Sequence, residues 1–161
     1  MGRLKATEKA YIAGLIDGEG CLRIEFDKRN NCGNPLIQIT NNNREVLEWC
    51  KEALGCGEIY KNESKAFVYR LRKKDVLRVL LAIKNHLIIK RRHADVLLAF
   101  TKCRIKKRKV PILDEKTGRI KGSLPNPLDP LELKCLQQLK ELNRLRGSSG
   151  TVMGIFVGQK T

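Results

Sequence analysis

The residues with the clearest chemical potential are two carboxylates in the stretch Ala10-Tyr-Ile-Ala-Gly-Leu-Ile-Asp-Gly-Glu-Gly20. The stretch is typical of the end of a buried helix, which places Asp17 and Glu19 at a helix C-terminus. That end carries partial negative charge, and an acid there is disfavoured by about 0.3–1 kcal/mol. Acids gathered at such a position need a cation to neutralise them. Oxygen-only ligands suit Mg²⁺, which retains water and favours phosphate oxygens.

Small residues recur every four positions in the same stretch, at Ala10, Gly14 and Gly18. This spacing lines one face of a helix and lets a second backbone approach closely. Glycine inside a helix costs about 1 kcal/mol relative to alanine, so we expect a packing reason for Gly14. A two-fold partner would bring a second Asp17 and Glu19 beside the first. The residues therefore predict a paired acid site at a dimer seam, with metal ions bound there.

The charge of the chain indicates a polyanionic partner. Its 161 residues include 33 Lys and Arg against 17 Asp and Glu, for a net charge of +16. This excess favours nucleic acid or an anionic membrane as the partner. No apolar run is long enough to span a bilayer, and the N-terminus has no cleavable signal pattern. We therefore expect a soluble, intracellular nucleic-acid binder from a prokaryotic cytoplasm or an organelle, not a secreted or membrane protein.

The six cysteines form no Cys-x-x-Cys pair, and only two histidines are present. This argues against a zinc site. Reduced thiols are the favoured interpretation, and a structural disulfide stays open for a hyperthermophilic source.

The elements that must position the acids follow from hydrophobic periodicity. A helix over residues 10–17 precedes strands over 21–28 and 36–40, and a second helix runs from 41 to 55. A second hairpin over 58–62 and 66–72 leads to helices over 75–83 and 93–100. This order predicts an α+β domain with one antiparallel sheet and helices on one face.

The segments predicted along the chain are a core domain over residues 1–103, a basic loop over 104–128, a C-terminal helix over 129–146 and a Gly-rich tail over 147–161. The start of the C-terminal helix, Asp129-Pro-Leu-Glu132, combines a capping acid, a Pro at the first helical position and a reciprocal Glu.

Polar side chains of both hairpins are expected on the sheet face away from the helices. Arg suits guanine, Gln and Asn suit adenine, and acids accept from cytosine. A solvated face explains each strand taken alone, but the net charge favours a face that reads DNA. The basic runs over residues 90–92 and 102–109 are interpreted as phosphate contacts. The candidate base contacts are Arg23, Glu25, Asp27, Arg29, Gln38, Tyr60, Asn62, Arg70 and Arg72.

The stretch Ile12-Ala-Gly-Leu-Ile-Asp-Gly-Glu-Gly20 resembles the signature of the LAGLIDADG homing endonucleases, with six of nine letters identical. The αββαββα order is also similar, over roughly residues 7–100. The resemblance implies a saddle-shaped sheet and motif helices that form the subunit seam. Because one motif is present, it implies the homodimeric, intron-encoded class that recognises a near-palindromic site.

In that family the last acid of the motif and an adjacent backbone carbonyl bind the catalytic metal, which implies Glu19 and Gly18 as ligands of Mg²⁺, with Mn²⁺ or Ca²⁺ as substitutes. A polar residue at the end of the second strand organises water, which implies Asn41, and a basic residue near the scissile phosphate implies Lys90. A helix N-cap for Asn41 and a simple phosphate clamp for Lys90 stay open as alternatives. The seam residues expected are Ala10, Ala13, Gly14 and Asp17.

The activity implied by the resemblance is metal-dependent hydrolysis of both strands of double-stranded DNA at a specific long site. The alternative is a non-cleaving nucleic-acid binder of the same fold, either an RNA splicing maturase or a transcription regulator. The presence of Glu19, Asn41 and Lys90 favours the enzyme.

Overall fold

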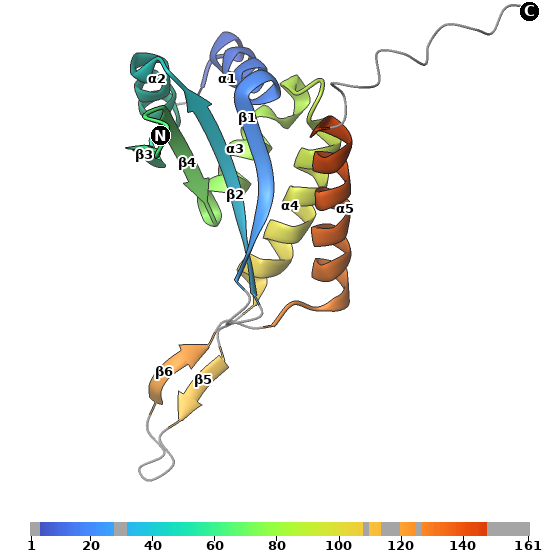
Figure 1. Ribbon diagram of the computed structural model, residues 1–161. Coiled ribbons are helices and arrows are strands. Elements are labelled where there is room, and N and C mark those ends of the chain that lie inside the picture. Colours follow the sequence, from blue (N-terminus) through green and yellow to red (C-terminus); the bar gives the residue numbers. More distant parts are fainter. Residues whose placement is uncertain (1–3, 28–31, 108–109, 114–119, 125–126, 148–161) are drawn as a thin grey trace, which may run out of the picture.

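The computed structural model describes residues 4–27, 32–107, 110–113, 120–124 and 127–147. Its centre is an antiparallel sheet in the order β1-β2-β4-β3, with helices over one face (Figure 1). The strands are β1 (Gly20–Asp27), β2 (Cys32–Asn41), β3 (Glu58–Lys61) and β4 (Phe67–Arg72). The helices are α1 (Ala6–Glu19), α2 (Arg44–Leu54), α3 (Lys74–Ile83), the 3₁₀ turn η1 (Lys84–His86), α4 (Arg91–Lys106) and α5 (Pro130–Gly147). The predicted α+β class and αββαββα order are confirmed.

Alternation along the strands sorts their residues onto two faces of the sheet. Leu22 pairs with Ile37, and Ile37 pairs with Leu71, so the three side chains share one face. All three are fully buried in the core, together with Ile12 and Ile16 of α1. Burying each such side chain contributes about 1.5–3 kcal/mol. This packing fixes α1 against the sheet.

The passage from α1 into β1 takes place without a loop, because the helix ends at Glu19 and the strand begins at Gly20. A Cβ on Gly20 would lie 2.6 Å from the carbonyl oxygen and 2.8 Å from the Cα of Ile16, so the junction requires glycine. The helix starts earlier than predicted, at Ala6, and the Lys5 amide donates to the Glu8 carboxylate at 2.7 Å. The tight junction holds Gly18 and Glu19 at one end of the sheet.

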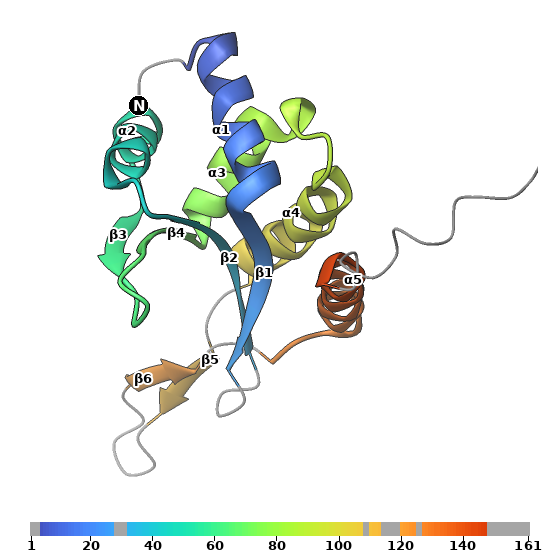
Figure 2. The same cartoon turned by 45° about the horizontal axis from the view of Figure 1, so that its top comes forward.

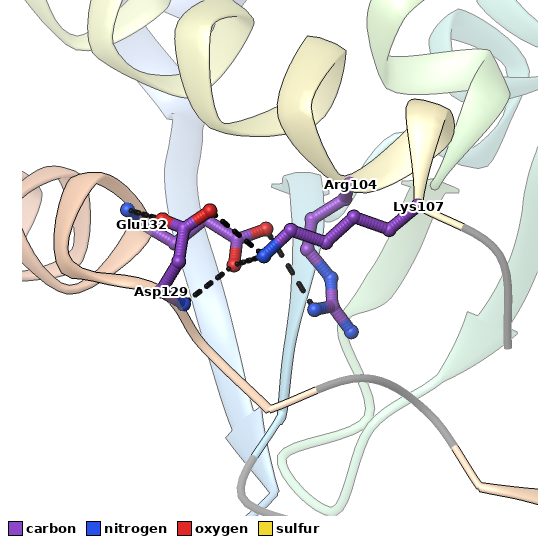
Figure 3. Close-up of polar contacts among 4 residues, drawn as sticks. All are labelled: Arg104, Lys107, Asp129 and Glu132. Carbon is purple, nitrogen blue, oxygen red and sulfur yellow. Dashed lines mark hydrogen bonds and ion pairs between the residues drawn. The ribbon is translucent and has the colours of Figure 1, made fainter. Parts of the chain in front are cut away.

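The helices α4 and α5 lie side by side (Figure 2) and are joined by a cluster of charged side chains (Figure 3). Asp129 accepts from the Glu132 amide at 2.8 Å, and Glu132 accepts from the Asp129 amide at 3.0 Å. This is the reciprocal cap that the sequence predicts. The fully buried Glu132 carboxylate also lies 2.6 Å from Lys107 Nζ and 3.6 Å from an Arg104 nitrogen of α4. The cluster therefore fixes the start of α5 to the end of α4.

The segment predicted as a basic loop over residues 104–128 is partly ordered into regular structure, so the prediction of a loop is wrong there. The helix α4 continues to Lys106, and a separate antiparallel hairpin follows, formed by β5 (Val110–Leu113) and β6 (Ile120–Leu124). The hairpin extends away from the body of the domain, beyond the end of β1 and the start of β2 (Figures 1 and 2). The predicted tail from residue 148 onward lies outside the described residues.

None of the six cysteines, all of which lie in the described residues, forms a disulfide, so the bridge that the sequence left open is absent from this structure. No helix within the described ranges is both long enough and apolar enough to cross a membrane.

Candidate active site and nucleic-acid interface

The end of α1 presents oxygen atoms to solvent. Gly18 and Glu19 are exposed, and no described residue forms a hydrogen bond or ion pair with the Glu19 carboxylate. An exposed carboxylate next to backbone carbonyls is a donor set that fits a hard divalent cation which keeps several waters. In the part of the chain that the structure describes, no three His, Cys, Asp or Glu side chains gather as a metal site.

The contacts of Asp17 explain why an acid occupies this end of α1. Its carboxylate points to the start of α4, where it accepts from the amides of Ile88, Ile89 and Lys90 at 2.7, 3.2 and 2.8 Å. A carboxylate at a helix N-terminus is favoured by the helix dipole. Asp17 is thereby buried, with 6% of its surface exposed. Asp17 ties the end of α1 to the start of α4.

Lys90 is also buried, at 1% exposed. Its ammonium donates to the carbonyl oxygens of Ile16 at 2.5 Å and Asp17 at 2.8 Å. The ammonium thus caps the C-terminus of α1 in this structure, whereas the sequence predicts a place for Lys90 near the scissile phosphate.

Asn41 ends β2 next to the same helix end. Ile39 pairs with Gly20 of β1, so Asn41 lies two residues farther along β2, in the direction of Gly18. Its side-chain oxygen accepts from the Asn43 amide at 2.8 Å. The N-cap of α2 is Asn43, which accepts from the Val46 amide, and the alternative of a cap at Asn41 is excluded. The Asn41 amide nitrogen donates no hydrogen bond to the described part of the chain.

The predicted seam residues fall into two groups. Ala10, Gly14 and Gly18 are exposed on α1, and a Cβ on either glycine would meet nothing within 4 Å. Ala13 has no exposed surface and Asp17 is nearly buried, because both face the protomer's own interior. The outward positions of α1 are thus Ala10, Gly14 and Gly18, whereas the predicted seam residues Ala13 and Asp17 turn toward the protomer's core.

Two apolar residues that the sequence analysis did not select lie beside the end of α1. Ile88 and Ile89 are 86% and 61% exposed, although their amides are fixed by Asp17. Tyr11 is also exposed, and its ring meets Trp49 edge-on at 5.2 Å. The sequence did contain a signal for this exposed pair. Two adjacent apolar residues that fit no helical or strand period stand directly before a basic run.

The sheet face away from the helices carries most of the predicted base contacts. The register aligns Arg23 of β1 and Arg72 of β4 on either side of the buried Leu36. Gln38 pairs with Arg70 across β2 and β4, and accepts from Arg23 at 3.3 Å. Two more contacts hold side chains on this face. Arg72 forms an ion pair with Glu25 at 3.8 Å, and the Arg70 guanidinium lies 4.7 Å from the centre of the Tyr60 ring. These guanidinium and amide groups therefore lie on the same face of the sheet.

The remaining predicted contacts that the structure describes, Asp27 and Asn62, lie at or next to the ends of strands. Asp27 pairs with Cys32 at the end of β1, and Arg29 lies outside the described residues. The Asn62 side-chain oxygen accepts from Ser64 Oγ and the Ala66 amide, both at 2.9 Å. Asn62 therefore shapes the β3–β4 turn, and its carbonyl oxygen is occupied there.

Two cations near Asn41 were missed by the sequence analysis. Phe67 pairs with Asn41 across the sheet, and its ring lies 5.1 Å from Lys61 Nζ and 5.7 Å from the Arg44 guanidinium. Lys61 ends β3 and Arg44 begins α2, and the Phe67 ring of β4 is the contact that the two cations share.

Comparison with known proteins agrees with this geometry. The family described as LAGLIDADG endonuclease matches residues 12–104, more than half of the chain. Among curated proteins there is no match to the sequence.

Similar solved structures include the homing endonuclease I-CvuI in complex with its target, with a TM-score of 0.62 and 18% identity over 84% of this chain and 82% of that one. The archaeal intron-encoded homing endonuclease I-Vdi141I, complexed with DNA, has a TM-score of 0.54 and 20% identity over 86% of this chain and 98% of that one. The LAGLIDADG meganuclease I-AabMI, bound to uncleaved DNA, has a TM-score of 0.55 and 24% identity over 82% of this chain but 43% of that one. The family match and the shared fold lead to one conclusion: the chain belongs to the LAGLIDADG endonuclease family.

Proposed function

We propose that two copies of this chain form a site-specific homing endonuclease that makes a double-strand break in a long, near-palindromic DNA site with divalent metal ions. The observation that carries the proposal is the exposed Glu19 carboxylate, which no described residue pairs with, at the end of a helix whose outer face is lined by small residues. A second α1 on that face brings a second Glu19 beside the first.

The lengths of the similar structures support a two-copy assembly. This chain spans 82% of I-CvuI and 98% of I-Vdi141I, but 43% of I-AabMI and 44% each of I-LtrWI and I-SmaMI. A chain that matches less than half of those longer proteins is the size of one of two halves. We place Ala10, Gly14 and Gly18 at the seam, and extend it to the exposed Ile88 and Ile89.

Glu19 and the Gly18 carbonyl would hold Mg²⁺, for which Mn²⁺ or Ca²⁺ would substitute. When bound, such an ion supplies an activated water and stabilises charge on the reacting oxygens. Asn41 would orient water through its amide nitrogen, because its oxygen is held by Asn43. An amide does not titrate, so Asn41 positions water and takes no proton.

DNA would lie against the sheet face that carries Arg23, Gln38, Arg70 and Arg72. Their guanidinium and amide groups match the edges of guanine and adenine in the major groove. Binding should weaken steeply with salt, since log K falls by about 0.9 per phosphate contact for each tenfold rise in salt. A flat salt response would contradict this interface.

The proposal is tested with a target selected from randomised duplexes. The wild type should cut both strands of the selected duplex with Mg²⁺, whereas Glu19→Gln should bind it and leave it intact. The matched control is Glu52→Gln, which removes an exposed acid from the last turn of α2 and should cut normally. A wild type that binds structured RNA and nicks no selected duplex would instead indicate a non-cleaving binder.

A further inference from the structure

We propose that Lys90 is a positioning residue, whose buried ammonium sets the backbone that presents Gly18 and Glu19 and does not touch a DNA phosphate. This inference rests on the proposed function, because it assigns Lys90 a role toward the same metal site. It differs from the role that the sequence predicted for Lys90.

The first observation concerns the hydrogen-bond partners of the Lys90 ammonium. Lys90 Nζ lies 2.5 Å from the Ile16 oxygen and 2.8 Å from the Asp17 oxygen, and Lys90 is 1% exposed. Because α1 ends at Glu19, the Asp17 carbonyl has no helical amide four residues later to accept from. The last turn of α1 contains no basic residue of its own. Lys90 therefore supplies both a side-chain donor to these carbonyl oxygens and the cation that a helix C-terminus favours.

The second observation is that Lys90 and Asp17 each bind the main chain of the other's segment. While Lys90 donates to the main chain of Asp17, the Asp17 carboxylate accepts from the amides of Ile88, Ile89 and Lys90. Each charged side chain thus lies at the helix end of opposite partial charge. Swinging the ammonium out toward a phosphate would strip two carbonyl oxygens of this donor while the Lys90 backbone stays fixed by Asp17.

The Asp17–Gly18 peptide plane links the Lys90 hydrogen bond to the candidate metal ligands Gly18 and Glu19. The Asp17 carbonyl and the Gly18 amide belong to the same planar unit, so a hydrogen bond to one orients the other. Gly18 has no side chain, and a Cβ there would meet nothing within 4 Å, so packing does not set its backbone. Lys90 therefore sets the peptide from which the Gly18 carbonyl and the Glu19 side chain follow.

The test compares Lys90→Met with wild type by ¹⁵N NMR during titration with Mn²⁺, which broadens amide signals near a weak site. In the wild type, Mn²⁺ should broaden the amides of Gly18, Glu19 and Gly20. In Lys90→Met, these amides should shift and the apparent Mn²⁺ affinity should fall at least fivefold. The control is Arg91→Met, which removes the neighbouring exposed cation and should leave the Mn²⁺ titration unchanged while weakening DNA binding.

Equal Mn²⁺ affinity in wild type and Lys90→Met would overturn this inference and leave the proposed function intact. Absence of broadening near Glu19 in the wild type would overturn both. Single-turnover cutting of the selected duplex also distinguishes a positioning role of Lys90 from a phosphate contact. A positioning defect should be restored to within threefold of wild type by raising Mg²⁺, whereas a hundredfold loss that persists at saturating Mg²⁺ would indicate a phosphate contact and overturn the inference.

A second test uses the wild-type protein, so it does not depend on whether Lys90→Met folds. Lysine acylation followed by mass spectrometry should label Lys90 at least tenfold more slowly than the exposed Lys73, with and without DNA. Labelling of Lys90 at the rate of Lys73 in the DNA-free protein would overturn the inference.

Discussion

Substitution of Gly14 should change the stability of the protomer and of the dimer in opposite directions. In the protomer, a Cβ on Gly14 meets nothing within 4 Å. Alanine in a helix interior is favoured over glycine by about 1 kcal/mol, so Gly14→Ala should stabilise the isolated protomer by about that amount. At a two-fold seam the added methyl occurs twice. Overpacking of a close contact costs about 1–3 kcal/mol per site, so the dimer should lose at least about 2 kcal/mol.

The dimer dissociation constant should accordingly rise at least about thirtyfold, since 1.4 kcal/mol corresponds to a factor of ten. Sedimentation equilibrium gives this constant, and urea unfolding at high dilution gives the stability of the protomer. The control is Ala99→Leu, which adds bulk to an exposed position of α4 and should leave the dissociation constant unchanged. A Gly14→Ala protein that gains stability and dimerises as tightly as wild type would refute the close helix seam.

Three further predictions concern single side chains. Burial lowers the pKa of His93, against smaller opposing effects of the Leu142 backbone and the Asp17 charge. The unfolded state therefore takes up a proton first as pH falls below about 6.5; the free energy of unfolding should drop between pH 7.5 and 5.5, and less so in His93→Gln. Glu132→Gln should cost about 1.5–3 kcal/mol in urea unfolding, because it weakens charged hydrogen bonds to a buried carboxylate. Burial raises the pKa of Cys50 to about 11, so at pH 8 a thiol reagent followed by mass spectrometry should modify it far more slowly than the partly exposed Cys21.

The parts of the fold that the sequence predicted are those set by local signals. Alternation predicted Tyr60 on the face away from the helices, and the register places it on the face opposite to the buried Tyr69. Gly55 ends α2 with φ at 61°, a backbone conformation that glycine adopts freely. The cap at Asp129 and Glu132 depends on residues three apart, which a single sequence displays directly.

The parts that the sequence missed depend on contacts between distant segments. Lys90 and Asp17 are 73 positions apart, and only the packing of α1 against the start of α4 buries the ammonium. A basic residue before a basic helix looks the same in sequence whether it faces DNA or caps a buried helix. Ala13 was expected at the seam, although the helical period turns it inward.

The hairpin β5–β6 was missed for a different reason. Its strands have four and five residues, and a Pro and a Gly interrupt the short apolar runs. Composition dominated by Lys and Arg around residues 102–109 indicated a loop, whereas strand pairing depends on partners seven to fourteen residues away.

The central claim is that Glu19 serves metal-dependent cutting of DNA by two copies of the chain. The most direct measurement mixes wild type with Glu19→Gln protein and follows the selected duplex in Mg²⁺ by gel. The account predicts double-strand breaks from wild type, none from the variant, and a fall in double-strand cutting as the variant fraction in mixed dimers rises. Undiminished cutting by Glu19→Gln alone would contradict it.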